Sequence, residues 1–263
     1  MVYFYAYNYI MSVKVKTYLN QMLEQTHQGA VITSVWLKTL GISNSLQQSY
    51  RNNGWIYSIG NGAFVKYNDT PTLNGAVYTM QNQLALDVHF GAKSALVFHG
   101  MNHFIQLENF QNFLFSNNKI KQPKWFIEYF KHNNYQWIKT DFLPSKLGIT
   151  VFNDVFPLDI STPERAILEM IYLSPDIISL KEVYQTLELL VNLRPKLLQE
   201  LLESCSSIKV KRLFLYMAEK VNHDWFASLK IEAINLGSGK RIITKGGKLD
   251  TKYNIVIEEL GEI

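Results

Sequence analysis

A short polar segment at residues 43–52 has the residue types that read DNA bases. Its sequence, SNSLQQSYRN, holds amides, hydroxyls and one guanidinium, and Leu46 and Tyr50 fall four residues apart, on one face of a helix. On a helix in the major groove, Gln and Asn bind adenine through two hydrogen bonds and Arg binds guanine. The candidate base and phosphate contacts are Ser43, Asn44, Ser45, Gln47, Gln48, Arg51 and Asn52.

Three predicted helices and a hairpin would position this segment. Apolar residues at spacings of three and four predict helices over 12–26 and 31–40, before the polar third helix over 43–52. A Gly-Asn-Gly turn at 60–62 then joins two strand-like runs, WIYS and AFVKYN. This order is typical of a winged helix-turn-helix, whose third helix enters the major groove while Lys66 of the hairpin lies beside the DNA backbone.

Basic residues concentrate towards the two ends of the chain, although the net charge is only +4. Residues 1–85 contain five Lys or Arg and two acids, and residues 205–255 contain ten and four. A surface for a polyanion would explain this distribution, and for the second region solvated lysines on ordinary helix faces explain it equally well. The second predicted basic surface comprises Lys209, Lys211, Arg212, Lys240, Arg241 and Lys245.

Composition excludes several classes of protein. With 47% hydrophobic and 18% charged residues, the 263-residue chain is expected to bury a core and to form one or two domains. The single Cys205 excludes a disulfide framework and favours a reducing, cytoplasmic location. No apolar run approaches the ~18 residues of a membrane span. Residues 1–10 do not resemble a signal peptide, and we interpret residues 1–11 as an extension or a misassigned start.

Other residues that could do chemistry have a simpler structural interpretation. His99 and His103 have the spacing of a metal-binding pair, but Gly100 is expected to end the helix between them, so we predict no metal site. The run LGSGK lacks the order of a phosphate loop. Glu164 and Arg165 would need a further partner for acid–base catalysis, and a helix start explains Glu164 without one. We therefore expect no catalytic residues and no cofactor.

The remainder of the chain predicts a mixed α/β domain. Helices are expected over 72–84, 91–100, 124–131, 161–172, 180–191, 195–205 and 209–220, and strands over 110–115, 135–142, 148–152, 240–245 and 253–257. The predicted fold class is therefore α+β. It places a winged helix-turn-helix domain over 12–85 and a mixed α/β C-terminal domain over 86–263.

Several segments, taken in order, resemble one known family. They are GAKSALVFHGMNHF at 91–104, STPERAILEMIY at 161–172, NLRPKLLQELLESC at 192–205, VKRLFLYMAEKVNHDWF at 210–226 and LGSGKRIITKGGKLDTKYNI at 236–255. With the predicted winged helix, the chain resembles the AbiEi-type antitoxins of bacterial type IV toxin–antitoxin and abortive-infection systems over residues 12–257.

The resemblance implies a function in phage defence. A member of this family is expected to be a cytoplasmic, non-enzymatic repressor that binds inverted repeats in double-stranded operator DNA and so regulates its own operon. It is also expected to antagonise a nucleotidyltransferase-like toxin without forming a stable complex with it. No membrane partner is implied.

Two other functions stay open on the sequence alone. One is an enzyme that reverses or opposes the toxin's modification, although no phosphate loop or paired metal-binding carboxylates are visible. The other is a scaffold whose winged helix contacts protein and never DNA, because Lys and Arg residues for phosphate contacts are sparse within 12–85. Such a scaffold would show no salt-dependent affinity for DNA.

Overall fold

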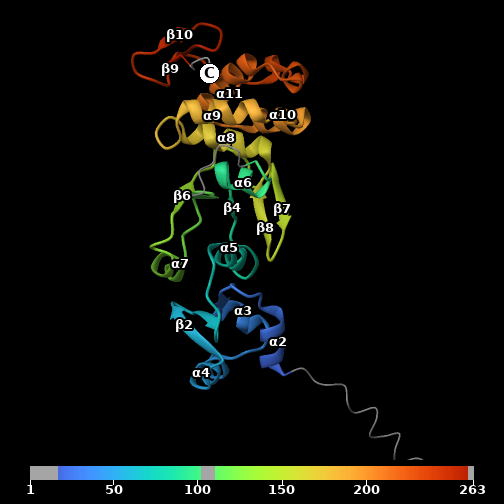
Figure 1. The fold of residues 1–263 in the computed structure, drawn as a ribbon, viewed down its shortest axis with the longest axis vertical. Coiled ribbons are helices and arrows are strands. Elements are labelled where there is room, and N and C mark those ends of the chain that lie inside the picture. Colours follow the sequence, from blue (N-terminus) through green and yellow to red (C-terminus); the bar gives the residue numbers. More distant parts are fainter. Residues whose placement is uncertain (1–16, 102–109, 260–263) are drawn as a thin grey trace, which may run out of the picture. The chain divides into compact units, whose positions relative to one another are not determined.

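The structure, a computed structural model, describes residues 17–101 and 110–259 (Figure 1). Its internal contacts divide the chain into two units. The first holds the residues up to Ala85 together with Gln122–Lys131, and the second holds the remainder. The prediction of a boundary after residue 85 places 122–131 in the second domain, whereas in the structure this segment belongs to the first unit. The predictions for residues 1–16 and for His103 lie outside the described residues.

The first unit is a winged helix-turn-helix, as the sequence predicts. Its elements are α2 (Tyr18–Gln25), β1 (Ile32–Thr33), α3 (Ser34–Thr39), α4 (Asn44–Asn52), β2 (Ile56–Gly60), β3 (Ala63–Lys66) and α5 (Leu73–Asn82). The strands form an antiparallel sheet in the order β1-β3-β2. The second predicted helix is shorter than expected, because Ile32 and Thr33 pair with β3 before α3 begins.

Local chemistry explains where these elements begin and end. Thr33 and Ser43 accept hydrogen bonds from the backbone N–H groups of Trp36 and Leu46, so each caps the helix that follows. The wing turn has three consecutive residues with positive φ, of which the central one is Asn61 at 49°. The core beneath α3 and α4 contains Met22, Leu37, Ile42, Ile56 and Phe64.

The second unit is built on a five-stranded mixed sheet in the order β6-β5-β4-β8-β7. Its strands are β4 (Val88–Phe90), β5 (Asn112–Ser116), β6 (Tyr135–Lys139), β7 (Ile149–Asn153) and β8 (Pro157–Ser161). The sequence does not predict β8, nor β4, whose three residues are all buried and too few to show an alternation. β5 and β6 are parallel, and their connection contains α7 (Lys124–Tyr129).

One helix of this unit, α8 (Pro163–Leu173), is almost wholly buried. The helices around it are α6 (Ala92–Phe98), α9 (Leu180–Leu189), α10 (Pro195–Ser204) and α11 (Ile208–Val221). α8 contacts each of the other four, and α6 also contacts β5 and β8. After two short 3-10 turns, β9 (Arg241–Ile242), β10 (Lys248–Asp250) and β11 (Ile255–Ile257) form a small sheet in the order β10-β11-β9. α8 therefore joins the central sheet to the helical layer.

Candidate nucleic-acid interface

The solvent-facing side of α4 is a row of polar side chains that bond to one another. Gln48 Nε2 donates to Asn52 Oδ1 at 2.8 Å, and Arg51 Nη1 donates to Gln48 Oε1 at 3.2 Å. At the start of the helix the hydroxyl oxygens of Ser43 and Ser45 lie 2.8 Å apart. The exposed side chains of this row are Ser43, Asn44, Ser45, Gln48, Arg51 and Asn52. These bonds orient the row while leaving donors and acceptors for a ligand.

Gln47 faces the interior, which corrects its prediction as a base contact. Its side chain lies in a residue that is only 4% exposed. The Oε1 atom accepts from Ser34 Oγ at 2.8 Å, and Nε2 donates to the carbonyl of Ile42 at 3.1 Å. Gln47 therefore ties α3 to α4. The sequence spacing indicates this burial, because Gln47 lies three residues before Tyr50 and so shares the buried face of the helix.

The ammonium group of Lys66 also bonds within the fold. Its Nζ donates to the carbonyl of Thr26 at 2.8 Å, and the side chain is half-buried. Its contact with the DNA backbone stays a prediction. Trp55, which the sequence predicts only as part of a strand, lies three residues after the end of α4 and is 46% exposed. Its indole N–H is a donor suited to phosphate, so it joins the candidate interface.

The second basic surface is smaller than predicted, because Arg212 is a buried structural residue. Its guanidinium donates to the carbonyls of Leu236, Gly237, Gly239 and Asn254 at 2.6–3.1 Å. The residue is 3% exposed, and burial, with the nearby Arg241 charge, lowers its pKa. The glycine-rich run that superficially resembles a phosphate loop is thus organised around the chain's own arginine.

Two more members of this predicted surface are corrected. Lys211 is only 3% exposed. Lys209 Nζ donates to the carbonyls of Tyr172 and Ser174 at 2.8 and 2.7 Å, and burial lowers the pKa of this lysine. Lys209 therefore has its ammonium group within the fold, where the two carbonyls compensate for its partial burial. The residues that remain exposed are Lys240, Arg241 and Lys245.

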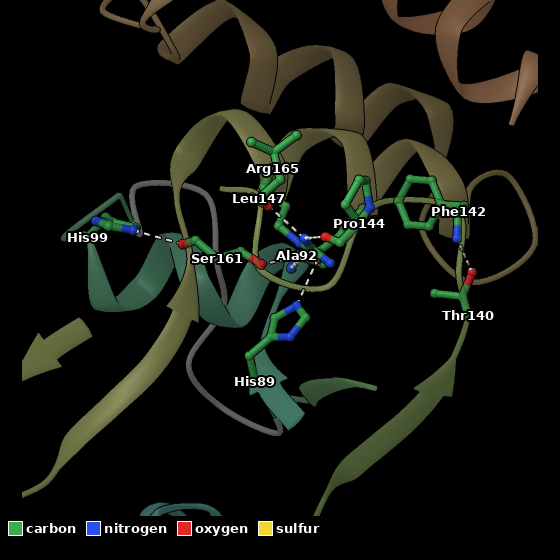
Figure 2. A network of polar contacts seen from close by, with 10 residues as sticks. His89, Ala92, His99, Thr140, Phe142, Pro144, Leu147, Ser161 and Arg165 are labelled. Atoms are coloured by element: carbon green, nitrogen blue, oxygen red, sulfur yellow. Dashed lines mark hydrogen bonds and ion pairs between the residues drawn. The ribbon is translucent and has the colours of Figure 1, made fainter. Parts of the chain in front are cut away.

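Four residues from separate segments bond to a buried carboxylate, Glu169 of α8. Figure 2 labels these partners, which are His89, Ala92, Ser161 and Arg165. Its Oε1 accepts from His89 Nε2 at 3.0 Å and from Arg165 Nε at 2.8 Å. Its Oε2 accepts from the Ala92 backbone N–H at 2.9 Å and from Ser161 Oγ at 2.8 Å. This Glu169 network unites β4, α6, β8 and α8. The sequence could not reveal it, because His89 and Glu169 lie 80 residues apart.

The Glu169 network is a structural ion pair. Burial alone would raise the pKa of Glu169, but His89 and Arg165 lower it to about 2, so the carboxylate is ionised. A Cβ on Gly91 would lie 2.3 Å from Glu169 Oε2, which explains the glycine before α6. The adjoining hollow, lined in part by His89 and Arg165, measures about 30 Å³ and has room for about one water molecule. Glu169 itself does not line this hollow.

The other candidates for chemistry are also engaged in the fold. His99 Nε2 donates to the carbonyl of Ser161 at 2.9 Å. Glu164 pairs with Arg194, whose Nη2 lies 2.9 Å from Glu164 Oε2, so it does not form a pair with Arg165. Burial raises the pKa of the Cys205 thiol. Within the two described ranges, no three His, Cys, Asp or Glu side chains gather where they could hold a metal ion.

Comparison with known proteins identifies a family and a fold. Residues 15–107 match the N-terminal domain of a transcriptional regulator described as an AbiEi antitoxin, and residues 110–258 match the AbiEi antitoxin transcriptional regulator of a type IV toxin–antitoxin system. No curated protein matches the sequence. The crystal structure of the RV2827C protein from Mycobacterium tuberculosis is similar, with a TM-score of 0.60 and 10% identity over 90% of this chain and 88% of that chain. At this identity the likeness shows the fold alone.

Proposed function

Because the chain belongs to the AbiEi antitoxin family of type IV toxin–antitoxin transcriptional regulators, we propose that it binds double-stranded operator DNA through the exposed face of α4. The observation that carries this proposal is the row Gln48, Arg51 and Asn52, which is exposed and mutually bonded on the second helix of a helix-turn-helix. Amides and a guanidinium in this setting match the hydrogen-bonding edges of adenine and guanine. The protein thereby represses its own operon from inverted repeats.

The same chain acts as an antitoxin against a nucleotidyltransferase-like toxin. Lys240, Arg241 and Lys245 are the exposed cations of the C-terminal sheet region and are the residues proposed to support cooperative DNA binding or neutralisation. Replacing all three with alanine is expected to weaken one of these activities. If both persist unchanged, this surface is only solvated. The antagonism proceeds without a stable complex, so co-purification of a stoichiometric heteromer would contradict that part of the proposal.

The protein works without catalysis, in the cytoplasm where bacterial DNA lies. Glu164 and Arg165, the pair weighed from the sequence for acid–base catalysis, are buried and bonded to Arg194 and Glu169. No helix in the described ranges has the length and apolar character that crossing a membrane requires. Incubating toxin-modified substrate with the purified protein tests the first statement. Removal of the modification would establish the enzymatic alternative instead.

Salt titration of DNA binding tests the proposal directly. The purified protein is mixed with its own upstream DNA or with a scrambled duplex of equal length, and affinity is measured as salt rises. A preference for upstream DNA that persists at high salt is expected, because base contacts do not depend on counterion release. Equal and steeply salt-dependent binding to both duplexes would indicate charge attraction only, and absence of binding would support the scaffold.

Arg51→Ala and Gln48→Ala variants then locate the interface on α4. Each is expected to lower affinity for upstream DNA more than for the scrambled duplex. Lys181→Ala is a suitable control for lost charge, because Lys181 is exposed on α9 in the second unit. Unchanged preference in the α4 variants would remove the assignment of this helix.

A further inference from the structure

α7 carries positive charge to the winged helix from the middle of the chain. The connection between β5 and β6, residues 117–134, contains four lysines and only one carboxylate, Glu128. Residues 122–131 belong to the first unit, where α7 contacts the wing strand β2. The lysines are Lys119, Lys121, Lys124 and Lys131. Lys124 and Lys131 lie within the first unit, so a charge count for residues 1–85 misses two of its cations.

Contacts with β2 and one hydrogen bond place α7 in the first unit, and its aromatic side chains are buried. Trp125, Phe126 and Phe130 are at most 3% exposed, and the Phe126 and Phe130 rings stack with centroids 5.3 Å apart. Burial of aromatic side chains of this size anchors a short helix that would be marginal alone. At the tip of the wing, Asn61 Nδ2 donates to Glu128 Oε2 at 3.0 Å. α7 is therefore a fixed part of the wing, and its polar side chains face outward.

Two lysines of this segment have side chains that are exposed and not used in ion pairs within the described fold. Lys124 and Lys131 are exposed, and no ion pair involves either of them in the part of the chain that the structure describes. Lys66, the lysine of the hairpin itself, instead donates to the carbonyl of Thr26. The ammonium group of Lys66 is thus bonded within the fold, while those of Lys124 and Lys131 are exposed to a ligand.

We propose that Lys124 and Lys131 bind operator phosphates beside the wing and supply backbone contacts that the winged helix itself lacks. This inference rests on the proposed function, in which α4 of the same unit binds DNA. Phosphate contacts from lysine position a protein on the duplex without reading its sequence. Glu128 lies between the two lysines in the sequence and at the wing turn, so its negative charge opposes the same contact. The balance of these charges sets how tightly the wing holds the DNA backbone.

Three variants test the inference by salt titration on the operator and on a scrambled duplex. Lys124→Ala with Lys131→Ala is expected to lower affinity for both duplexes on the order of tenfold and to reduce the salt slope by about two. Glu128→Gln is expected to tighten binding to both duplexes, because the amide oxygen still accepts from Asn61 while the charge is gone. Thermal midpoints of all variants are expected to match the unaltered chain, since the changed side chains are exposed.

The control pair removes the same charge elsewhere. Lys181 of α9 and Lys196 of α10 are exposed and belong to the second unit, so Lys181→Ala with Lys196→Ala is expected to bind both duplexes like the unaltered chain. Equal losses in the control pair and the α7 pair would overturn the inference, because net charge alone would then explain them.

Other outcomes separate this inference from the proposed function. If the α7 pair keeps normal affinity and salt slope while Arg51→Ala weakens operator binding, the inference falls and the proposed function stands. If the unaltered chain binds no DNA, both fall. If DNA binding is normal and toxin neutralisation is lost in the α7 pair, the lysines serve a protein partner and the inference is again overturned.

Discussion

The polar row on α4 and the Glu169 network have similar side chains in opposite surroundings. On α4, an arginine and two amides bond to one another and remain exposed. Around Glu169, an arginine and a histidine bond to one carboxylate that is 0% exposed. In solvent, such side chains keep donors and acceptors for a ligand, whereas in the interior each must be satisfied within the fold. Burial, more than residue type, therefore separates the polar side chains that remain accessible to a ligand from those that stabilise the fold.

The largest expected effect is the loss of the buried carboxylate. Glu169→Ala leaves Arg165 and His89 without their partner, and breaking a buried ion pair in this way costs about 3–5 kcal/mol of the free energy of unfolding. Urea denaturation measures this value. Intact stability in Glu169→Ala would show that the Glu169 network does not stabilise the fold.

Acid should weaken the same network. The pKa of Glu169 in the folded chain is about 2, below its ordinary value of 4.5, so the stability it contributes is present above pH 4.5 and is lost as pH falls towards 2. The shift corresponds to a loss on the order of 3 kcal/mol. Denaturant midpoints between pH 7 and pH 3 measure it. Glu169→Gln, which cannot titrate at this position, is expected to show a flatter pH dependence.

Arg212→Ala tests whether a predicted surface cation is structural. The variant leaves the carbonyls of Leu236, Gly237 and Gly239 without their donor, while that of Asn254 still accepts from the Arg241 N–H, and it is expected to lower the free energy of unfolding by about 3 kcal/mol. Lys240→Ala is the control, because its side chain is exposed and its effect should stay within about 0.5 kcal/mol. Similar stabilities in the two variants would return Arg212 to the basic surface.

Arg51→Ala should alter recognition and leave stability unchanged. Loss of one bidentate base contact is expected to cost about 1–3 kcal/mol of binding free energy on the operator. The thermal midpoint should not move, because the side chain is exposed. A lowered midpoint with normal affinity would reverse the comparison, placing α4 among the structural elements.

Gln47→Ala gives the smallest and most diagnostic effect. The residue lies on the same helix as Arg51 but bonds inward to Ser34 and Ile42, so a loss of about 1 kcal/mol of unfolding free energy is expected. Base preference should be unchanged, as measured by competition between single-substitution operators. Altered preference at one base pair would show that Gln47 reads DNA after all.

Much of the fold follows from local patterns in the sequence. The third helix and its Ser43 cap, the Gly-Asn-Gly wing turn and the helices of the C-terminal part agree with prediction because each rests on neighbouring residues. The family resemblance is confirmed as well. β4 escaped prediction because both of its pairing partners, β5 and β8, are distant in sequence, whereas β8 also pairs with its neighbour β7. Periodicity cannot report partners of that kind.

The sequence by itself determined the winged helix-turn-helix, the α+β class and the family, because turns, caps and apolar spacing act over a few residues. Only the tertiary structure decided which polar residues are accessible. It turned Gln47, Lys211 and Arg212 inward and joined His89 to Glu169. It also placed α7 against the wing. These outcomes depend on contacts across tens of residues, where burial and the requirement to satisfy every polar group override the local pattern.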